Sequence, residues 1–392
     1  MAMVMGRPGQ RRQKRPPKAR TIQIRDFTGG VNQTDSRVAI KDNECAWLEN
    51  AIPIGGGALQ VLHGPGPAIA TFAQGVSRMF GIVLNGAPFH IVVHPNGAMT
   101  QLSPGGVQTV ISGAGSVTSP VIAVWRGTTV LILDPSTGYS SWDGTTYTII
   151  SASQTGDALA VFQGRAWLIR ARLITFTAPN TFSNFSAGDG AGSTVLTDEA
   201  FPGNIVQATS ALEQLWLVGT GAVEALANVA STGTSPNVVT TFSLTNIVTN
   251  LGTNAQHSVL GYFRALAFLA PFGVYALAGV TPQKISEKLD GLFPFLTLTT
   301  AFAQAAVAVV QNLLCLIFRV TYTGQNAQAG PGPIPLLLVF TGGKWCFAHQ
   351  GAVAWITSLL VDGVAQAWGT DGSTVFRLFG AADDVAVVGK IQ

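Results

Sequence analysis

A unit of two apolar strands joined by a tight turn recurs seven times along this chain. The strands that open the units align on His90, Val130, Trp167, Trp216, Ala267, Cys315 and Ala367. Successive intervals range from 37 residues, between Val130 and Trp167, to 52 residues, between Cys315 and Ala367. Repeats of this length, rich in short strands, are typical of β-propellers, where each repeat supplies one four-stranded blade. The sequence therefore predicts an all-β fold, a β-propeller-like ring of about seven irregular blades (six to eight fit the pattern) with a small N-terminal extension.

Few residues of this chain carry charge. Of its 392 residues only 10% are charged and 47% are hydrophobic, with 45 glycines, whereas about a quarter charged is usual. Such a chain buries much of itself in packed sheets or against partners. The longest uncharged apolar stretch, residues 291–318, is interrupted by Pro294 and a run of threonines. We therefore expect buried strands there, with one helical turn around Ala303–Val310, and no membrane span.

The basic residues are concentrated at the N-terminus. Eight of the 22 lie within residues 1–25, which contain no acid, so the remainder carries 14 basic and 19 acidic residues, a net charge of −5. No apolar core follows the basic start, so we expect no secretory leader. Residues 1–20 are expected to be disordered alone, either as a solubilising tail or as a segment that docks on an acidic protein surface or nucleic acid. The candidate partner-binding residues are Arg11, Arg12, Lys14, Arg15, Lys18 and Arg20.

Residues 21–63 form a different module. Residues 21–27 alternate like a strand, and residues 40–51 suggest a short helix with Asp42 as its N-cap and Cys45, Trp47 and Leu48 on its apolar side. Residues 52–62 indicate two strands around a glycine hairpin. The propeller is predicted to occupy residues 64–392, with repeats from Arg78 onward.

Turn signals and long polar stretches mark the connections between strands. Hairpin tips are expected at residues 142–147 and 341–347, where Asp-Gly and Gly-Gly suit positive φ. Long loops are expected at residues 180–205, 228–240 and 322–335. Loops on a regular scaffold often carry contacts, so these are candidate partner surfaces.

No set of residues indicates catalysis or cofactor binding. His90 and His94 share a strand face, but no acidic or cysteine ligand lies near them in sequence, and Asp189 between two glycines suggests a turn rather than a calcium site. Cys45, Cys315 and Cys346 are expected to be reduced core residues. We expect no catalytic residues, no metal and no cofactor. A propeller glycosidase would need a carboxylate pair, and the sparse acids in the repeats are Asp134, Asp143, Asp157, Asp189, Asp198, Glu199, Glu213 and Glu224.

Several segments, in order, resemble the tail nozzle proteins of short-tailed phages, also called tail hub or packaged-DNA stabilisation proteins. These open with a Phe-x-Gly-Gly-hydrophobic-Asn segment, here residues 27–32, followed by an acid-rich turn and a glycine hairpin, here residues 41–50 and 55–59. Later matches occur at residues 164–167, 175–186, 208–226, 273–275 and 284–286. The apolar composition and the basic N-terminus depart from the family pattern.

The resemblance implies a structural virion protein without enzymatic activity, made in the host cytoplasm. It implies a ring, usually of six copies, attached below the portal and adaptor, with tail-fibre proteins as neighbours and double-stranded DNA passing non-specifically along the ring axis. A mildly acidic body is compatible with this, because negative charge repels the DNA backbone. Two alternatives stay open: a tail adaptor or tail-fibre-attachment protein, and a propeller that binds or depolymerises glycans.

Overall fold

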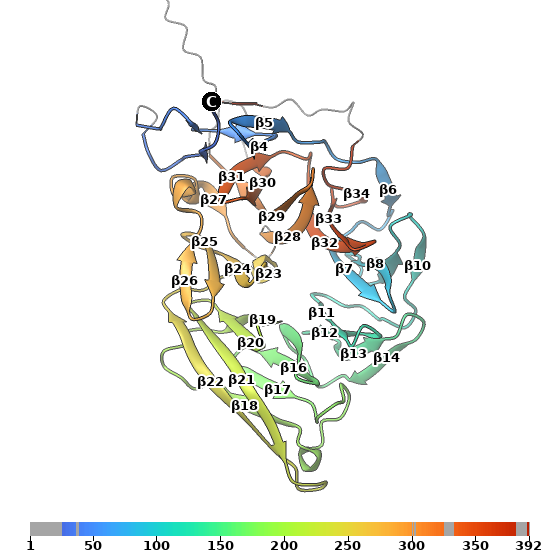
Figure 1. The fold of residues 1–392 in the computed structure, drawn as a ribbon. Helices are drawn as coiled ribbons and strands as arrows, with labels where there is room; N and C mark the ends of the chain where they lie inside the picture. Colours follow the sequence, from blue (N-terminus) through green and yellow to red (C-terminus); the bar gives the residue numbers. More distant parts are fainter. Residues whose placement is uncertain are drawn as a thin grey trace, which may run out of the picture.

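The computed structural model describes residues 26–36, 39–299, 301, 303–324, 333–381 and 390–391. Over these ranges the chain forms a seven-bladed β-propeller (Figure 1), and the described residues contain no α-helix. This confirms the predicted all-β fold class and the predicted number of blades.

The first three blades are regular antiparallel sheets of four strands. Blade 1 consists of β7 (Arg78–Leu84), β8 (Ala87–Val93), β9 (Met99–Leu102) and β10 (Gln108–Val110). Blade 2 consists of β11 (Val121–Trp125), β12 (Thr129–Asp134), β13 (Gly138–Trp142) and β14 (Tyr147–Ser151). Blade 3 consists of β15 (Ala158–Phe162), β16 (Arg165–Arg170), β17 (Leu173–Phe176) and β18 (Gly192–Val195).

The next three blades continue the pattern, and blades 4 and 6 include the longest strands of the propeller, of 10 or 11 residues. Blade 4 consists of β19 (Ile205–Ala211), β20 (Gln214–Gly219), β21 (Ala222–Thr232) and β22 (Val239–Thr249). Blade 5 consists of β23 (Leu260–Tyr262), β24 (Ala265–Ala270), β25 (Gly273–Ala278) and β26 (Thr281–Lys284). Blade 6 consists of β28 (Gln304–Val310), β29 (Leu313–Tyr322), β30 (Ile334–Thr341) and β31 (Lys344–Ala348), and the short β27 (Leu296–Thr297) also pairs with β29.

Blade 7 closes the ring with strands from both ends of the chain. It contains β32 (Trp355–Val361), β33 (Val364–Thr370) and β34 (Thr374–Arg377). Its fourth strand is β6 (Ala68–Thr71), which pairs antiparallel with β34 and immediately precedes blade 1. The N-terminal part of the propeller is thus held by the last blade.

The seven aligned strands of the sequence pattern are β8, β12, β16, β20, β24, β29 and β33, the second strand of every blade. The aligned residues are all at most 2% exposed. A second strand is paired on both edges and covered on both faces by neighbouring blades, so it reads as a continuous apolar run. The sequence pattern therefore detected the most buried layer of the propeller.

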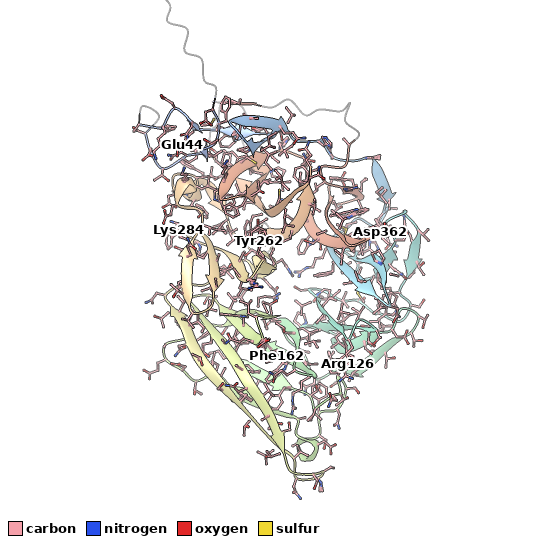
Figure 2. All side chains as sticks on the ribbon, viewed as in Figure 1. Glu44, Arg126, Phe162, Tyr262, Lys284 and Asp362 are labelled. Carbon is pink, nitrogen blue, oxygen red and sulfur yellow. The ribbon has the colours of Figure 1, made fainter. Side chains whose placement is uncertain are left out.

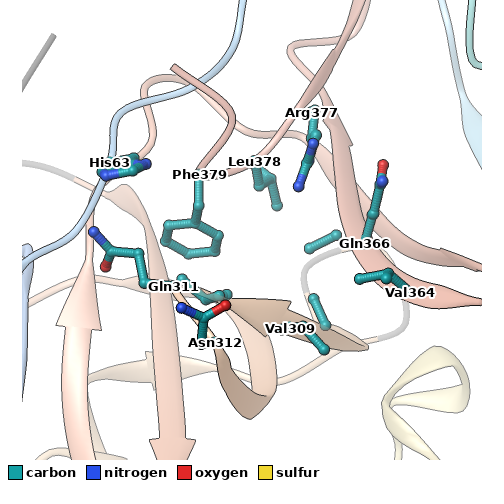
Figure 3. Close-up of a pocket in the computed structure, with 12 residues that line it drawn as sticks. His63, Val309, Gln311, Asn312, Val364, Gln366, Arg377, Leu378 and Phe379 are labelled. Carbon is teal, nitrogen blue, oxygen red and sulfur yellow. The ribbon is translucent and has the colours of Figure 1, made fainter. Parts of the chain in front are cut away.

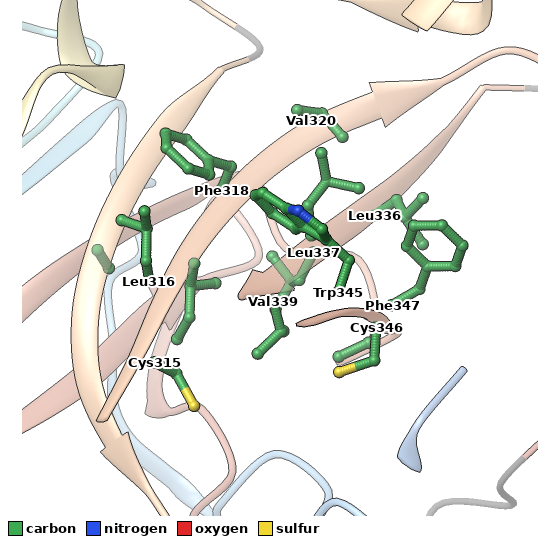
Figure 4. Packing of buried hydrophobic residues seen from close by; sticks show 14 of the residues in the cluster. Cys315, Leu316, Phe318, Val320, Leu336, Leu337, Val339, Trp345, Cys346 and Phe347 are labelled. Atoms are coloured by element: carbon green, nitrogen blue, oxygen red, sulfur yellow. The ribbon is translucent and has the colours of Figure 1, made fainter. Parts of the chain in front are cut away.

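The hydrophobic core is divided into clusters that lie between neighbouring blades. One cluster joins β7 and β8 of blade 1 with β12 of blade 2, and another joins blades 3 and 4. The largest surrounds blade 6, where Leu316, Phe318, Val339 and Phe347 pack together and Cys315 and Cys346 are reduced (Figure 4). Burial raises the pKa of the Cys315 thiol to about 11.

The N-terminal module lies against blade 6 and shares its hydrophobic cluster. Strand β3 (Leu48–Glu49) pairs with β31 and with β35 (Lys390–Ile391), and β1 (Gly30–Val31) pairs with β2 (Glu44–Cys45). The predicted hairpin is confirmed as β4 (Ala51–Gly55) and β5 (Ala58–Val61). The predicted helix at residues 40–51 is wrong. Trp47 and Leu48 are almost fully buried against blade 6, so packing overrides the weak local helix signal.

The Phe-x-Gly-Gly-hydrophobic-Asn segment has a geometric explanation. A Cβ atom on Gly29 would lie 2.3 Å from the Glu44 side chain, and Gly30 has φ +68°, so only glycine fits both positions. The Asn32 side chain is 4% exposed and donates to Glu44 Oε2 at 2.6 Å. Glu44 also pairs with Lys288, so this segment holds the module to the loop after blade 5.

Several predicted connections are confirmed and others are corrected. The hairpin tips at residues 142–147 and 341–347 are confirmed, with Gly342 and Gly343 both at positive φ. The helical turn predicted at Ala303–Val310 is wrong, because Gln304–Val310 is a strand paired along its length with β29. The described chain contains four short 3-10 helices: η1 (Ala187–Asp189), η2 (Gln256–Ser258), η3 (Glu287–Leu289) and η4 (Phe293–Phe295).

The predicted long loops are shorter than expected. Residues 180–205 contain η1 and strand β18, and most of residues 228–240 belong to β21 and β22. Their Ser, Thr and Gly content suggested loops, but pairing between neighbouring strands satisfies their backbone groups instead. Most of the predicted loop at residues 322–335, namely 325–332, lies outside the described residues.

Candidate interaction surface and buried polar groups

The sequence-predicted site residues do not form a site in the described part of the chain. Arg11, Arg12, Lys14, Arg15, Lys18 and Arg20 lie outside the described residues. His94 is buried and structural: Nδ1 faces the Gly75 carbonyl at 2.6 Å and Nε2 faces Thr100 Oγ1 at 2.8 Å. No group of three or more potential metal ligands occurs within the described ranges.

His90 is fully buried between blades 1 and 7. Its ring centroid is 4.8 Å from that of Trp368, and neither ring nitrogen has a hydrogen-bond partner among the described residues. Burial lowers the pKa of His90 to about 3, so the imidazole is neutral at physiological pH.

The repeat carboxylates are mostly used in local structure. Asp134 accepts from the backbone N–H groups of Thr118, Ser119, Ser136 and Thr137 at 2.8–3.0 Å. Burial opposes its ionisation, but the Ser136 hydroxyl and these N–H groups together lower its pKa. Asp134 therefore fixes a turn within blade 2 and is unsuited to proton transfer. Asp143 caps a hairpin turn. Asp189, predicted to lie in a turn, is the last residue of η1 and accepts hydrogen bonds from Asn184 and from Ser235 of the β21–β22 connection.

Glu224 is the exception, because it is an unpaired carboxyl in the interior. It lies on β21 and is 1% exposed, and neither of its oxygens has a hydrogen-bond partner within the described structure. Burial, followed by the negative charge of Asp198, raises its pKa to about 7, and Arg172 partly opposes this. Asp198 in turn accepts from the Ala200 N–H at 2.8 Å and from the Asn246 amide.

The axis of the propeller is crossed by side chains. Helix η2, between blades 4 and 5, brings Gln256 against the backbone of Asp157 before blade 3 and His257 against Arg78 of blade 1. The Arg78 Nη1 to His257 Nε2 distance is 3.1 Å, and the His257 ring also lies 4.8 Å from that of Trp355 in blade 7. Since Arg78 can only donate, Nε2 is the acceptor and His257 is neutral. Burial and the Arg78 charge lower the pKa of His257 to about 3.

A cavity of about 270 Å³ opens between blades 6 and 7 (Figure 3). Arg377 and Gln366 line one side, and Gln311, Asn312 and His63 the other, with Phe379 between them. The lining contains neither a carboxylate nor a hydroxyl or thiol nucleophile. The cavity can donate hydrogen bonds to a small polar molecule, but its lining supplies no carboxylate pair for hydrolysis.

The outer edges of blades 1–4 are uncharged. Strands β10, β14, β18 and β22 contain no Asp, Glu, Lys or Arg. Each carries a large exposed aliphatic residue, namely Val110 (69% exposed), Ile149 (62%), Val195 (55%) and Val239 (58%). The charged residues of these blades lie on inner strands, as Asp134 and Arg165 do, or in turns, as does Arg126 between β11 and β12 (Figure 2). Exposed sheet edges of soluble proteins are usually protected by charge, so this rim has the character of a contact surface.

Sequence reasoning missed both the rim and the interior carboxyl. The absence of Lys and Arg from the last strand of consecutive repeats was a signal available in the sequence, once the strand order within each repeat was known. Glu224 carried no signal, since its neighbours in space, Arg172 and Asp198, come from the preceding blade and the loop after it.

Comparisons with known proteins inform the fold alone. No family model matches the chain, and no curated protein matches its sequence. The fold is similar to the extracellular domain of BT4673 from B. thetaiotaomicron, described as a one-component system, with a TM-score of 0.50 and 10% identity over 80% of this chain and 40% of that chain. A second structure of that domain, described as a hybrid two-component system, gives a TM-score of 0.49 and 10% identity over 80% of this chain and 39% of that one. U3-55K gives a TM-score of 0.45 and 11% identity over 80% of this chain and 100% of its own. This chain therefore spans about two fifths of the BT4673 chains.

Within the described residues, no helix is long and apolar enough to cross a membrane.

Proposed function

We propose that this chain is a structural virion protein that forms the nozzle or hub ring of a short phage tail. The ring attaches below the portal and adaptor, retains the packaged DNA and conducts it during ejection. The observation that carries this proposal is the uncharged outer rim of blades 1–4, with at least one exposed large aliphatic residue on each outer strand. A rim of this kind is suited to burial between subunits. The resemblance of the ordered motifs from Phe27 to Ser286 to tail nozzle proteins supports the identity proposed for the assembly.

The proposed DNA conduit lies between copies of the chain and not within one propeller. The contact between Arg78 and His257 spans the propeller axis, with Trp355 beside it. Duplex DNA could not pass there without unfolding the inner strands. A ring of several copies provides a wider opening, and the net charge of −5 over residues 26–392 disfavours tight binding of the phosphate backbone.

A glycan-cleaving function has less support. Asp198 and Glu224 are close enough for their charges to interact, and the pKa of Glu224 is raised, as a general acid requires. However, Glu224 is only 1% exposed, so no polysaccharide could reach its carboxyl. We therefore propose that the protein is not an enzyme. A tail adaptor or tail-fibre-attachment role would use the same rim and differs only in the position within the particle.

The test is assembly of the purified full chain, alone and with portal–adaptor complexes, followed by electron microscopy. We expect closed rings that add below the adaptor and no release of sugars from host polysaccharides. A chain that stays monomeric and does not join the complexes would contradict the proposal. Polysaccharide cleavage that is lost on Glu224→Gln would favour the enzyme instead.

A further inference from the structure

Strand β22 presents a long edge with no pairing partner. It is the last strand in the order β19-β20-β21-β22, and its outer edge pairs with no strand of the described chain. The strand has 11 residues, without charge or proline, and seven of them are β-branched. Beyond Leu226 the β21–β22 hairpin extends past the end of β20, so part of this edge projects from the blade (Figure 1). Two irregularities in its pairing with β21 bend the strand but add no protecting charge.

The other outer strands show that this edge is unusual within the same molecule. Strands β10, β14, β18 and β6 are only three to five residues long. Strand β26 has four residues and includes Pro282 and Lys284, and β31 is covered by β3. Shortness, proline, lysine, cover and β-bulges are the usual protections of an edge strand. Of the outer strands that the structure describes, β22 alone lacks the first four, and the two irregularities in its pairing with β21 are its only protection.

The chain contains a segment of complementary character. Residues 21–24, Thr-Ile-Gln-Ile, alternate like a strand and are flanked by Arg20 and Arg25, and residues 1–25 carry eight basic residues and no acid. On the acceptor side, residues 99–260 contain eight acids, four arginines and no lysine. Asp198 bonds to Asn246 of β22, and Glu199 beside it is exposed. Residues 21–24, uncharged and flanked by basic residues, therefore complement the uncharged edge of β22, which lies beside Asp198 and Glu199.

The geometry favours a second copy as the donor. The described chain starts at Asp26, and the Phe27 N–H bonds to the Gly57 carbonyl in the module on blade 6. Blade 5 separates this point from blade 4, and Figure 1 places β4 and β5 at the opposite end of the molecule from the β21–β22 tip. Five extended residues span at most about 17 Å, roughly the width of one four-stranded blade, which leaves no length to lie along β22 of the same chain.

We propose that residues 21–25 of one copy add as a strand to the outer edge of β22 in a second copy, while the preceding basic residues contact the acidic surface beside it. Each copy then donates at one place and accepts at another, a head-to-tail arrangement that can close into a ring. Strand addition of this kind gains affinity from backbone hydrogen bonds. The inference rests on the self-association in the proposed function and names the surfaces that make it.

The test uses full-length single-cysteine additions, because the native Cys45, Cys315 and Cys346 are at most 5% exposed. Ile22→Cys protein is mixed with Leu244→Cys protein under mild oxidation, and the covalent dimer is measured on non-reducing gels. We expect the mixed disulfide to form at least about tenfold faster than with the control Val280→Cys, which is 67% exposed in the turn between β25 and β26 and lies outside the rim of blades 1–4, and to decrease at high salt. Equal cross-linking to the two positions would overturn the proposal, as would a double variant Ile22→Cys/Leu244→Cys that closes only within one chain.

A second measurement is needed because the strands could pair in a register that keeps the two cysteines apart. Thr245→Lys places a charge on the β22 edge and is expected to weaken self-association at least about tenfold, whereas Thr145→Lys, in the exposed turn of blade 2, should leave it unchanged. Rings that assemble normally with Thr245→Lys would overturn the β22 contact and leave the proposed ring standing. Absence of any assembly in the wild type would refute the proposed function itself.

Discussion

Replacing Glu224 with glutamine should stabilise the protein above neutral pH. The folded state holds the Glu224 proton up to about pH 7, whereas the unfolded chain releases it near 4.5. Between these values the folded state binds more protons than the unfolded chain, so the free energy of unfolding decreases as pH rises. Above pH 7 Glu224 is ionised in both states, and this decrease is complete. At 1.36 kcal/mol per pH unit this difference is about 3 kcal/mol. Glutamine has nearly the same shape and no charge at any pH, so Glu224→Gln removes this cost.

The assay is urea unfolding of both proteins at intervals from pH 4 to pH 9. We expect Glu224→Gln to match the wild type near pH 4 and to exceed it by up to about 3 kcal/mol at pH 8. The matched control is Glu213→Gln, in the exposed turn between β19 and β20, which should change stability by less than about 0.5 kcal/mol. A Glu224→Gln effect that is the same at every pH, or a loss of stability at pH 8, would refute the reasoning.

Three further changes test the packing. His90 stays neutral in the folded protein until its pKa of about 3, whereas the unfolded chain protonates it near pH 6.5. The free energy of unfolding should therefore decrease as pH falls between these values, by up to about 5 kcal/mol. His90→Leu should make the protein more resistant to acid unfolding, measured by circular dichroism, and unchanged acid sensitivity would count against this. Arg165 is 1% exposed and donates to four neutral acceptors of blades 3 and 4. Arg165→Met leaves these acceptors without their donor and should destabilise by about 1–3 kcal/mol in urea, whereas exposed Arg170→Met should have little effect; equal effects would contradict this role of Arg165. A Cβ atom on Gly81 would lie 1.9 Å from a backbone carbonyl of blade 7, whereas one on Gly261 meets nothing within 4 Å. Gly81→Ala should therefore lower the midpoint of thermal unfolding sharply, and Gly261→Ala should lower it little. Equal midpoints for the two variants would contradict the close contact of Gly81 with blade 7.

The ring could be predicted from the sequence because one strand in each blade is buried on every side. Trp167 and Trp216 occupy equivalent places in β16 and β20, and both are at most 1% exposed. Such positions tolerate only apolar residues, so they recur even where the loops between them differ in length. The outer strands, such as β18, carry Gly, Ser and Thr, which sequence patterns assign to loops.

The N-terminal module shows where local reasoning fails. Residues 40–51 have the spacing of an amphipathic helix, but Trp47 contacts Phe347 and Tyr322, which come from blade 6. The partner that decides the structure lies about three hundred residues away in sequence. Closure of blade 7 by β6 is equally invisible, since four residues of ordinary composition pair with β34 at the other end of the chain.

The outer edges of blades 6 and 7 are covered by N-terminal strands, whereas no strand of the described chain covers the long edge of β22 in blade 4. Strand β3 covers the outer edge of blade 6, and β6 completes blade 7. N-terminal strands thus complete the blades at the C-terminal end of the chain: β6 closes the ring, and β3 protects the edge of blade 6. No equivalent strand covers β22 within the described residues, although its edge is longer than either of the edges that are covered. Because edge protection is a general requirement, the cover for β22 should come from outside the described residues. In the proposed arrangement, residues 21–25 of a neighbouring copy would cover β22, as β3 and β6 cover blades 6 and 7 within one chain.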